Sequence, residues 1–86
     1  MKNELIIDKF GDKRWYKNDL LHREDGPAIE YANGDKYWYI NGKCHREDGL
    51  AIEWTNGTKC WYLNGKRIEV SSQKEFERYL ELLVFT

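Results

Sequence analysis

The chain of 86 residues has no run of 18 or more apolar residues, so we expect no segment that crosses a membrane. Near the start, the only apolar run is Leu5–Ile7, and acidic residues flank it, which is not the pattern of a secretory signal. The chain has only two cysteines, Cys44 and Cys60, and no Cys-x-x-Cys pair, so we expect free thiols and no metal. Together these absences predict a cytoplasmic protein with reduced thiols.

An excess of positive charge is also lacking. Fourteen Lys and Arg stand against fifteen Asp and Glu, which gives a net charge of −1. Non-specific nucleic-acid binding needs a basic face that displaces counterions, so we do not expect a nucleic-acid partner. Proline is almost missing, with one residue, whereas four Trp, six Tyr and three Phe supply the area from which a small core can be built.

A 23-residue segment occurs twice in succession. Residues 22–44 and 45–67 align without a gap and are identical at 16 of 23 positions. Residues 4–21 resemble a third, degenerate copy, in which Asp19 replaces the glycine of the repeat. We therefore expect a single domain, 1–86, built from three repeats, with the least regular copy at one end.

Each full repeat contains two short aromatic and β-branched segments separated by Asn-Gly, and a second Asn-Gly follows. Asn-Gly is the strongest short signal for a hairpin, so successive hairpins predict an antiparallel meander sheet. We expect Ile29 and Trp38 to share the core face, with Tyr37 and Tyr39 on a half-polar face, although a slip of one residue would invert this assignment. The connecting "HREDG" segments predict turns at Asp-Gly and a row of partly solvated ion pairs made by their arginines.

The last segment changes period. Ser72 and Glu75 form a capping-box pattern, which predicts a helix over 72–83. Phe76 begins an apolar stripe with helical spacing, which continues at Tyr79, Leu80 and Leu83. We expect this amphipathic helix to cap the core face of the sheet.

The repeated pattern "HREDGPAIEY", "NG", "K-WY", "NGK" resembles the MORN-type hairpin repeats found in small proteins of bacteriophages and giant viruses. The resemblance covers residues 4–68. It implies an α+β, mainly β fold, with a twisted, rolled antiparallel sheet. It also implies a role in protein or surface binding and no catalysis.

Two chemical alternatives can be weighed on the residues. His22 and His45 lie beside acidic residues, as an acid–base site would require, but both sets recur at the same repeat position, which favours a structural role. Zinc ligation by the two cysteines and the two histidines lacks the usual spacing. We expect no enzyme activity and no cofactor.

The remaining candidates are binding residues. Tyrosine recurs with the repeat and combines area, rigidity and hydrogen bonding, as arginine does at interfaces, although the tyrosines also fit as packing partners of Ala28 and Ala51. The predicted function is a non-enzymatic interaction module that binds, and inhibits, a host protein or defence complex; single-stranded nucleic acid or nucleotide binding by a Tyr/Lys/Arg face is the alternative. Open sheet edges and the apolar tail predict homodimers as well. The predicted binding residues are Tyr16, Arg23, Tyr39, Arg46, Tyr62, Leu82 and Phe85.

Overall fold

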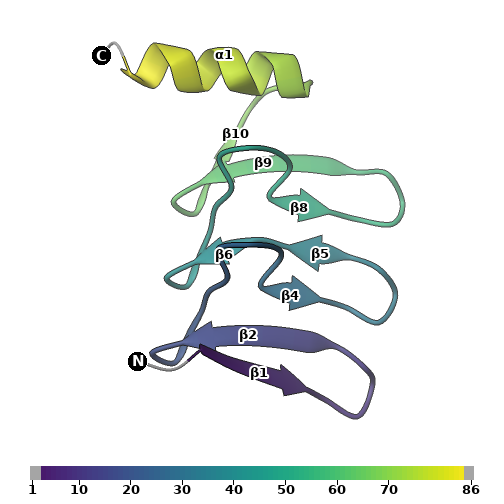
Figure 1. The fold of residues 1–86 in the computed structure, drawn as a ribbon. Helices are drawn as coiled ribbons and strands as arrows, with labels where there is room; N and C mark the ends of the chain where they lie inside the picture. The colour runs from purple at the N-terminus through teal and green to yellow at the C-terminus, as the bar shows by residue number, and fades with distance from the viewer. Residues whose placement is uncertain (1–2, 85–86) are drawn as a thin grey trace.

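The computed structural model describes residues 3–84, which form an antiparallel meander sheet and one C-terminal helix (Figure 1). Eight strands make the main sheet, in the order β1-β2-β4-β5-β8-β9-β10 with β3 beside β2, while β6 and β7 form a separate pair. The sheet is open, with β1 and β10 at its two ends. The elements are β1 (Asn3–Ile7), β2 (Lys13–Lys17), β3 (Leu20–Leu21), β4 (Ile29–Glu30), β5 (Lys36–Tyr37), β6 (Tyr39–Ile40), β7 (Lys43–Cys44), β8 (Ile52–Glu53), β9 (Lys59–Leu63), β10 (Lys66–Ile68) and α1 (Gln73–Val84).

Two-residue turns join β6 to β7 and β9 to β10. Asn41 and Gly42 have φ angles of 49° and 80°, and Asn64 and Gly65 repeat them at 51° and 83°. Positive φ at both central residues is the primed turn that suits the twist of a hairpin. In the degenerate copy, Asp19 adopts a φ of 65° in place of glycine, and the hairpin between β2 and β3 still forms.

The expected assignment of side chains to faces is wrong by one residue. Ile29 pairs with Tyr37, and in the next repeat Ile52 pairs with Cys60. Because residues directly opposite in antiparallel strands share a face, Ile29 lies with Tyr37 and Tyr39, and Trp38 lies on the other side.

The core is therefore divided between the two faces. On the first face, Cys44, Ala51, Ile52 and Cys60 are buried, with Tyr37, Tyr39, Trp54 and Tyr62 packed around them. At the C-terminal end, Trp61, Ile68 and Phe76 form a second buried cluster with Leu50, Leu63, Val70, Tyr79 and Leu80. The molecule extends 43 × 33 × 17 Å, so neither cluster is covered by a second full layer.

The helix cap is confirmed, with a variation. The Ser72 hydroxyl accepts a hydrogen bond from the Glu75 N–H at 3.2 Å, and the Glu75 carboxylate accepts one from the Ser71 N–H at 3.1 Å, one residue earlier than in the standard box. Phe76 is fully buried, whereas Leu83 is 48% exposed, so the apolar stripe ends before it. In Figure 1 the helix lies beyond β9 and β10, at the end of the sheet. No helix of the described residues could span a bilayer.

Candidate functional site

Two surfaces carry the residues that the sequence singled out, one on each face of the sheet. On the side of the sheet that carries Trp15 and Trp38, each "HREDG" segment places an arginine over a tryptophan of the preceding hairpin. The Arg46 guanidinium carbon lies 4.0 Å from the centre of the Trp38 ring. Its nitrogens donate to Asp48 at 2.8 Å, to the Leu50 carbonyl at 2.9 Å and to Glu53 at 3.2 Å. A cation stacked and bonded in this way is fixed in place.

The first full repeat builds the same arrangement. Arg23 lies 4.0 Å from the centre of the Trp15 ring and donates to Asp25 at 2.9 Å, to the Pro27 carbonyl at 3.2 Å and to Glu30 at 3.0 Å. The two "HREDG" segments therefore have equivalent contacts as well as equivalent sequences. The tryptophan–arginine stack was missed in the sequence, although a signal exists: Trp15 precedes Arg23 by eight residues, as Trp38 precedes Arg46.

The glycine of "HREDG" is explained by space and not by a turn that needs positive φ. A Cβ atom on Gly49 would lie 2.9 Å from the Arg46 guanidinium carbon, and one on Gly26 would lie 3.0 Å from that of Arg23. The arginine side chain thus passes directly over the glycine backbone. The Arg46 hydrogen bond lowers the pKa of Asp48 below its usual value, so this carboxylate stays charged in mild acid.

Both histidines bond to the next turn of the chain. The Nδ1 atom of His22 accepts a hydrogen bond from the Asn41 N–H at 2.9 Å, and His45 does the same with Asn64 at 2.9 Å. An accepting Nδ1 leaves the proton on Nε2 in the neutral ring. The Nε2 atom of His45 lies 2.9 Å from Glu47, whereas that of buried His22 lies 3.6 Å from Glu24 and has no closer partner. Both rings thus join a connecting segment to the hairpin turn that follows.

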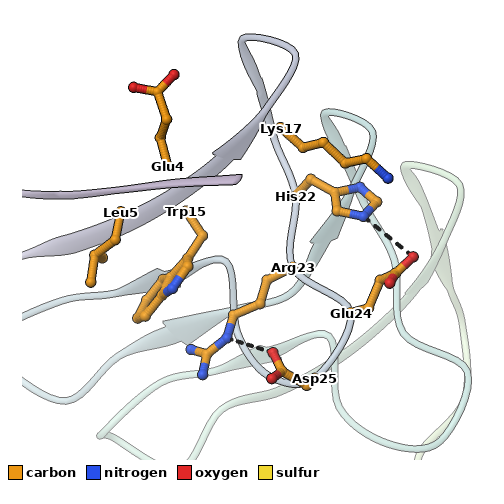
Figure 2. Close-up of a pocket in the computed structure, with 8 residues that line it drawn as sticks. All are labelled: Glu4, Leu5, Trp15, Lys17, His22, Arg23, Glu24 and Asp25. Carbon is orange, nitrogen blue, oxygen red and sulfur yellow. Dashed lines mark hydrogen bonds and ion pairs between the residues drawn. The ribbon is translucent and has the colours of Figure 1, made fainter. Parts of the chain in front are cut away.

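An open cleft lies beside the first of these segments, with a volume of about 490 Å³. Figure 2 shows its lining, with the His22–Glu24 and Arg23–Asp25 pairs drawn as dashed lines. A second cleft lies between the two "HREDG" segments, where Trp38 and Ile40 form part of the wall. Acidic residues line both clefts, and those of the two "HREDG" segments already pair with an arginine or a histidine.

The opposite side of the sheet carries a series of aromatic contacts, and we call this side the aromatic face. The Arg14 guanidinium lies 5.6 Å from the centre of the Tyr31 ring, and the Tyr31 and Tyr37 rings meet edge to face at 5.5 Å. The Tyr37 hydroxyl accepts a hydrogen bond from the Trp54 ring at 2.7 Å. The aromatic face comprises Tyr16, Tyr31, Tyr37, Tyr39, Trp54 and Tyr62, all of them half-buried.

Two buried thiols lie beneath the aromatic face. Burial, followed by the neighbouring Cys60, raises the pKa of Cys44 to about 11, so Cys44 is a protonated thiol at neutral pH. Burial also raises the pKa of Tyr39. Among residues 3–84, no three His, Cys, Asp or Glu side chains come together as metal ligands would.

The structure brings only part of the predicted binding set together. Tyr16, Tyr39 and Tyr62 share the aromatic face, but Trp15 and Trp38 precede two of them in the strands and point the other way. Arg23 and Arg46 stack on these tryptophans and therefore lie on the opposite face. Leu82 is 60% exposed on α1, and Phe85 lies outside the described residues.

The lysines are also separated from the tyrosines. In the sheet register, Lys13 and Lys36 both pair with Glu30, and Lys36 and Lys59 both pair with Glu53. Each of these lysines is two residues before a tryptophan, which places it on the tryptophan side. The combined Tyr/Lys/Arg face of the nucleic-acid alternative is therefore divided: these lysines lie with Arg23 and Arg46 on one side of the sheet, and the tyrosines lie with Arg14 on the other.

Comparison of the chain with protein-family models, with curated proteins and with solved structures gives no match.

Proposed function

We propose that this chain is a non-enzymatic interaction module whose aromatic face binds one protein partner. The observation that carries the proposal is the aromatic face itself: six half-buried rings lie on one side of a thin sheet, and a ring contact and a hydrogen bond link three of them, Tyr31, Tyr37 and Trp54. Tyrosine and tryptophan are enriched at the centres of protein interfaces because they add large area at little cost in conformational entropy.

The division of roles between the two faces supports this proposal. The arginines, histidines and acidic residues of the "HREDG" segments are used in holding one hairpin to the next. Positions on the aromatic face differ between the two full repeats, with Tyr31 replaced by Trp54 and Tyr37 by Cys60.

The proposal includes three repeats, of which 4–21 is the degenerate first copy; the rolled shape of the sheet stays a prediction.

The resemblance to phage and giant-virus repeat proteins extends the proposal to the class of partner. On this view the partner is a host protein or a host-defence complex in the cytoplasm, and the chain inhibits it by covering a surface. MORN-type membership itself is part of the proposal. Arg23, Arg46 and the lysines at positions 13, 36 and 59 lie on the side opposite the aromatic face, and Arg14 is the one cation that the described ring contacts place on it. This separation weighs against the nucleic-acid alternative.

Site-specific photo-crosslinking in bacterial extract tests the proposal. A photoreactive phenylalanine analogue is placed at Tyr16, Tyr31 or Tyr62 on the aromatic face, and at Lys36 or Lys59 as matched controls on the other face. We expect the same host protein to be crosslinked from the three aromatic positions and not from the two lysines. Crosslinks from the lysine positions alone, or none above background from any position, would refute the proposal.

A binding titration with the native chain tests the nucleic-acid alternative. A fluorescent single-stranded oligonucleotide is titrated with the native chain at low salt, and the anisotropy is measured again as salt is raised. We expect no binding. An affinity that falls steeply with salt would favour nucleic-acid binding in its place.

A further inference from the structure

We propose that two copies of this chain associate through strand β1 and join their sheets into one continuous antiparallel sheet about a two-fold axis. β1 is the last strand of the sheet at its N-terminal end, and in Figure 1 no described element lies beyond it. This strand edge is distinct from the aromatic face, so the inference does not depend on the proposed function.

The side chains of β1 are unusually apolar for an edge. Leu5, Ile6 and Ile7 are 48%, 50% and 56% exposed, and because they are consecutive they project from both faces of the sheet. At the other end of the sheet, β10 has its Ile68 only 5% exposed, beneath Phe76 of the helix. Protein edges are normally protected by charged side chains, proline, a bulge or a covering helix, and of these β1 has only Glu4 within Asn3–Ile7.

The backbone of β1 has its free hydrogen-bonding groups in known positions. The Trp15 N–H donates to the Ala28 carbonyl, and the Trp15 carbonyl accepts from the His22 N–H, so both groups point away from β1. Leu5, which pairs with Trp15, is therefore in a non-hydrogen-bonded pair, and its own N–H and C=O point outward. Asn3 and Ile7, two residues away on either side, direct theirs the same way.

Symmetry and charge then choose one register. A two-fold pair must join outward-directed residues, so Leu5 can oppose Asn3, Leu5 or Ile7 of the second copy. With Asn3 opposite Leu5, Glu4 faces Glu4 of the second copy. With Ile7 opposite Leu5, Glu4 faces Asp8. Like charges directly opposite are destabilising.

Only the register centred on Leu5 avoids this conflict. It places Leu5 opposite Leu5, Glu4 opposite Ile6, and the backbone of Asn3 opposite that of Ile7. The two Leu5 side chains then pack against each other on one face of the joined sheet, and on the other face each Ile6 lies opposite Glu4, so no like charges meet. The contact is isologous and uses the free edge of both copies, so the assembly closes at two chains and does not extend into a fibre.

Light scattering after size exclusion, over a range of concentrations, measures the assembly. We expect the native chain to reach twice its mass of 10.4 kDa and to dissociate on dilution. Leu5→Lys should give the monomer mass at every concentration, because it opposes two lysines on the axis. Leu82→Lys, which removes an exposed leucine from α1, is the matched control and should leave the dimer intact.

A crosslinking scan reads the register and does not depend on Leu5→Lys remaining folded. A hydrogen-bonded pair has its Cα atoms about 5.5 Å apart, a separation that a disulfide can bridge. Under mild oxidation, Leu5→Cys should give a covalent dimer, and Ile6→Cys and Ile7→Cys should not. The proposal is overturned by a native chain that stays monomeric at all concentrations. It is equally overturned by a dimer that Leu82→Lys abolishes, or by crosslinking that is no stronger at position 5 than at 6 and 7.

Discussion

At the scale of single residues, Arg46 shows why a charged side chain recurs at a fixed place in each repeat. It stacks on Trp38 and donates to one carbonyl and two carboxylates, so one guanidinium holds a hairpin, a connecting segment and a strand together. Lysine offers a point charge and no planar fork, so it cannot reproduce these contacts.

The first prediction concerns this contact. Arg46→Ala should lower the free energy of unfolding by about 2 kcal/mol, because it removes a stack on tryptophan and leaves the Leu50 carbonyl without its donor. Urea denaturation followed by tryptophan fluorescence measures the change. Arg67→Ala, at an exposed arginine, is the control and should stay within about 0.5 kcal/mol of the native chain. Equal effects of the two substitutions would contradict a special role for Arg46.

The residue scale is also where the sequence was least informative. The segment Tyr37-Trp38-Tyr39 is apolar at three consecutive positions, so an alternating pattern cannot show which side is buried. The register came out one residue away from the expectation. Both faces carry aromatic rings: arginines stack on the tryptophans of one face, and tyrosines make up most of the other. The pairing of Ile29 with Tyr37 is what shows which of these faces Ile29 belongs to.

At the scale of elements, the C-terminal helix was the most predictable part of the chain. Its period, its first residues and its buried Phe76 follow from local sequence, because helix capping and amphipathic spacing act within a few residues. The short strands were predictable as hairpins but not in their bounds, since pairing with a neighbouring repeat decides where a two-residue strand such as β4 begins and ends. In the candidate site, the repeat predicted that equivalent tyrosines such as Tyr39 and Tyr62 lie on one face. The stacking of the arginines on tryptophans was not predicted, because it depends on contacts between hairpins.

The second prediction concerns the start of α1. Hydrogen bonds from the Ser71 N–H and hydroxyl lower the pKa of Glu75 below its usual value of 4.5. A carboxyl with a lowered folded-state pKa stabilises the protein above the unfolded pKa, and this stabilisation is lost as pH falls through the folded value. The difference in stability between the native chain and Glu75→Gln should therefore be largest near neutral pH and shrink below pH 4.5. Chemical denaturation across this range measures it; a difference that does not change with pH would contradict the assignment.

At the scale of the whole molecule, the chain is a stack in which each hairpin contacts its neighbours along one direction. The sheet order follows the sequence closely, and the His22–Asn41 and His45–Asn64 bonds each reach only into the following turn. In such a stack, stability is a sum of units and of interfaces between nearest neighbours, so a loss at one end need not spread to the other. The internal repeat in the sequence predicted that successive hairpins lie side by side in an antiparallel meander, whereas the exposure of β1 follows from the absence of any described strand beyond it.

The third prediction uses the asymmetry of the stack. Deleting residues 71–86 removes Phe76 from Trp61 and Ile68, so β9 and β10 lose the apolar cover of their end. Hydrogen exchange should then quicken about tenfold or more at the Ala51 N–H, which bonds to the Cys60 carbonyl in β9, while the Trp15 N–H, bonded to the Ala28 carbonyl, should change little. Equal loss of protection at both amides would contradict this expectation. It would show that the sheet unfolds as one cooperative unit, since loss of the helix contacts would then destabilise the N-terminal hairpin, which the helix does not contact.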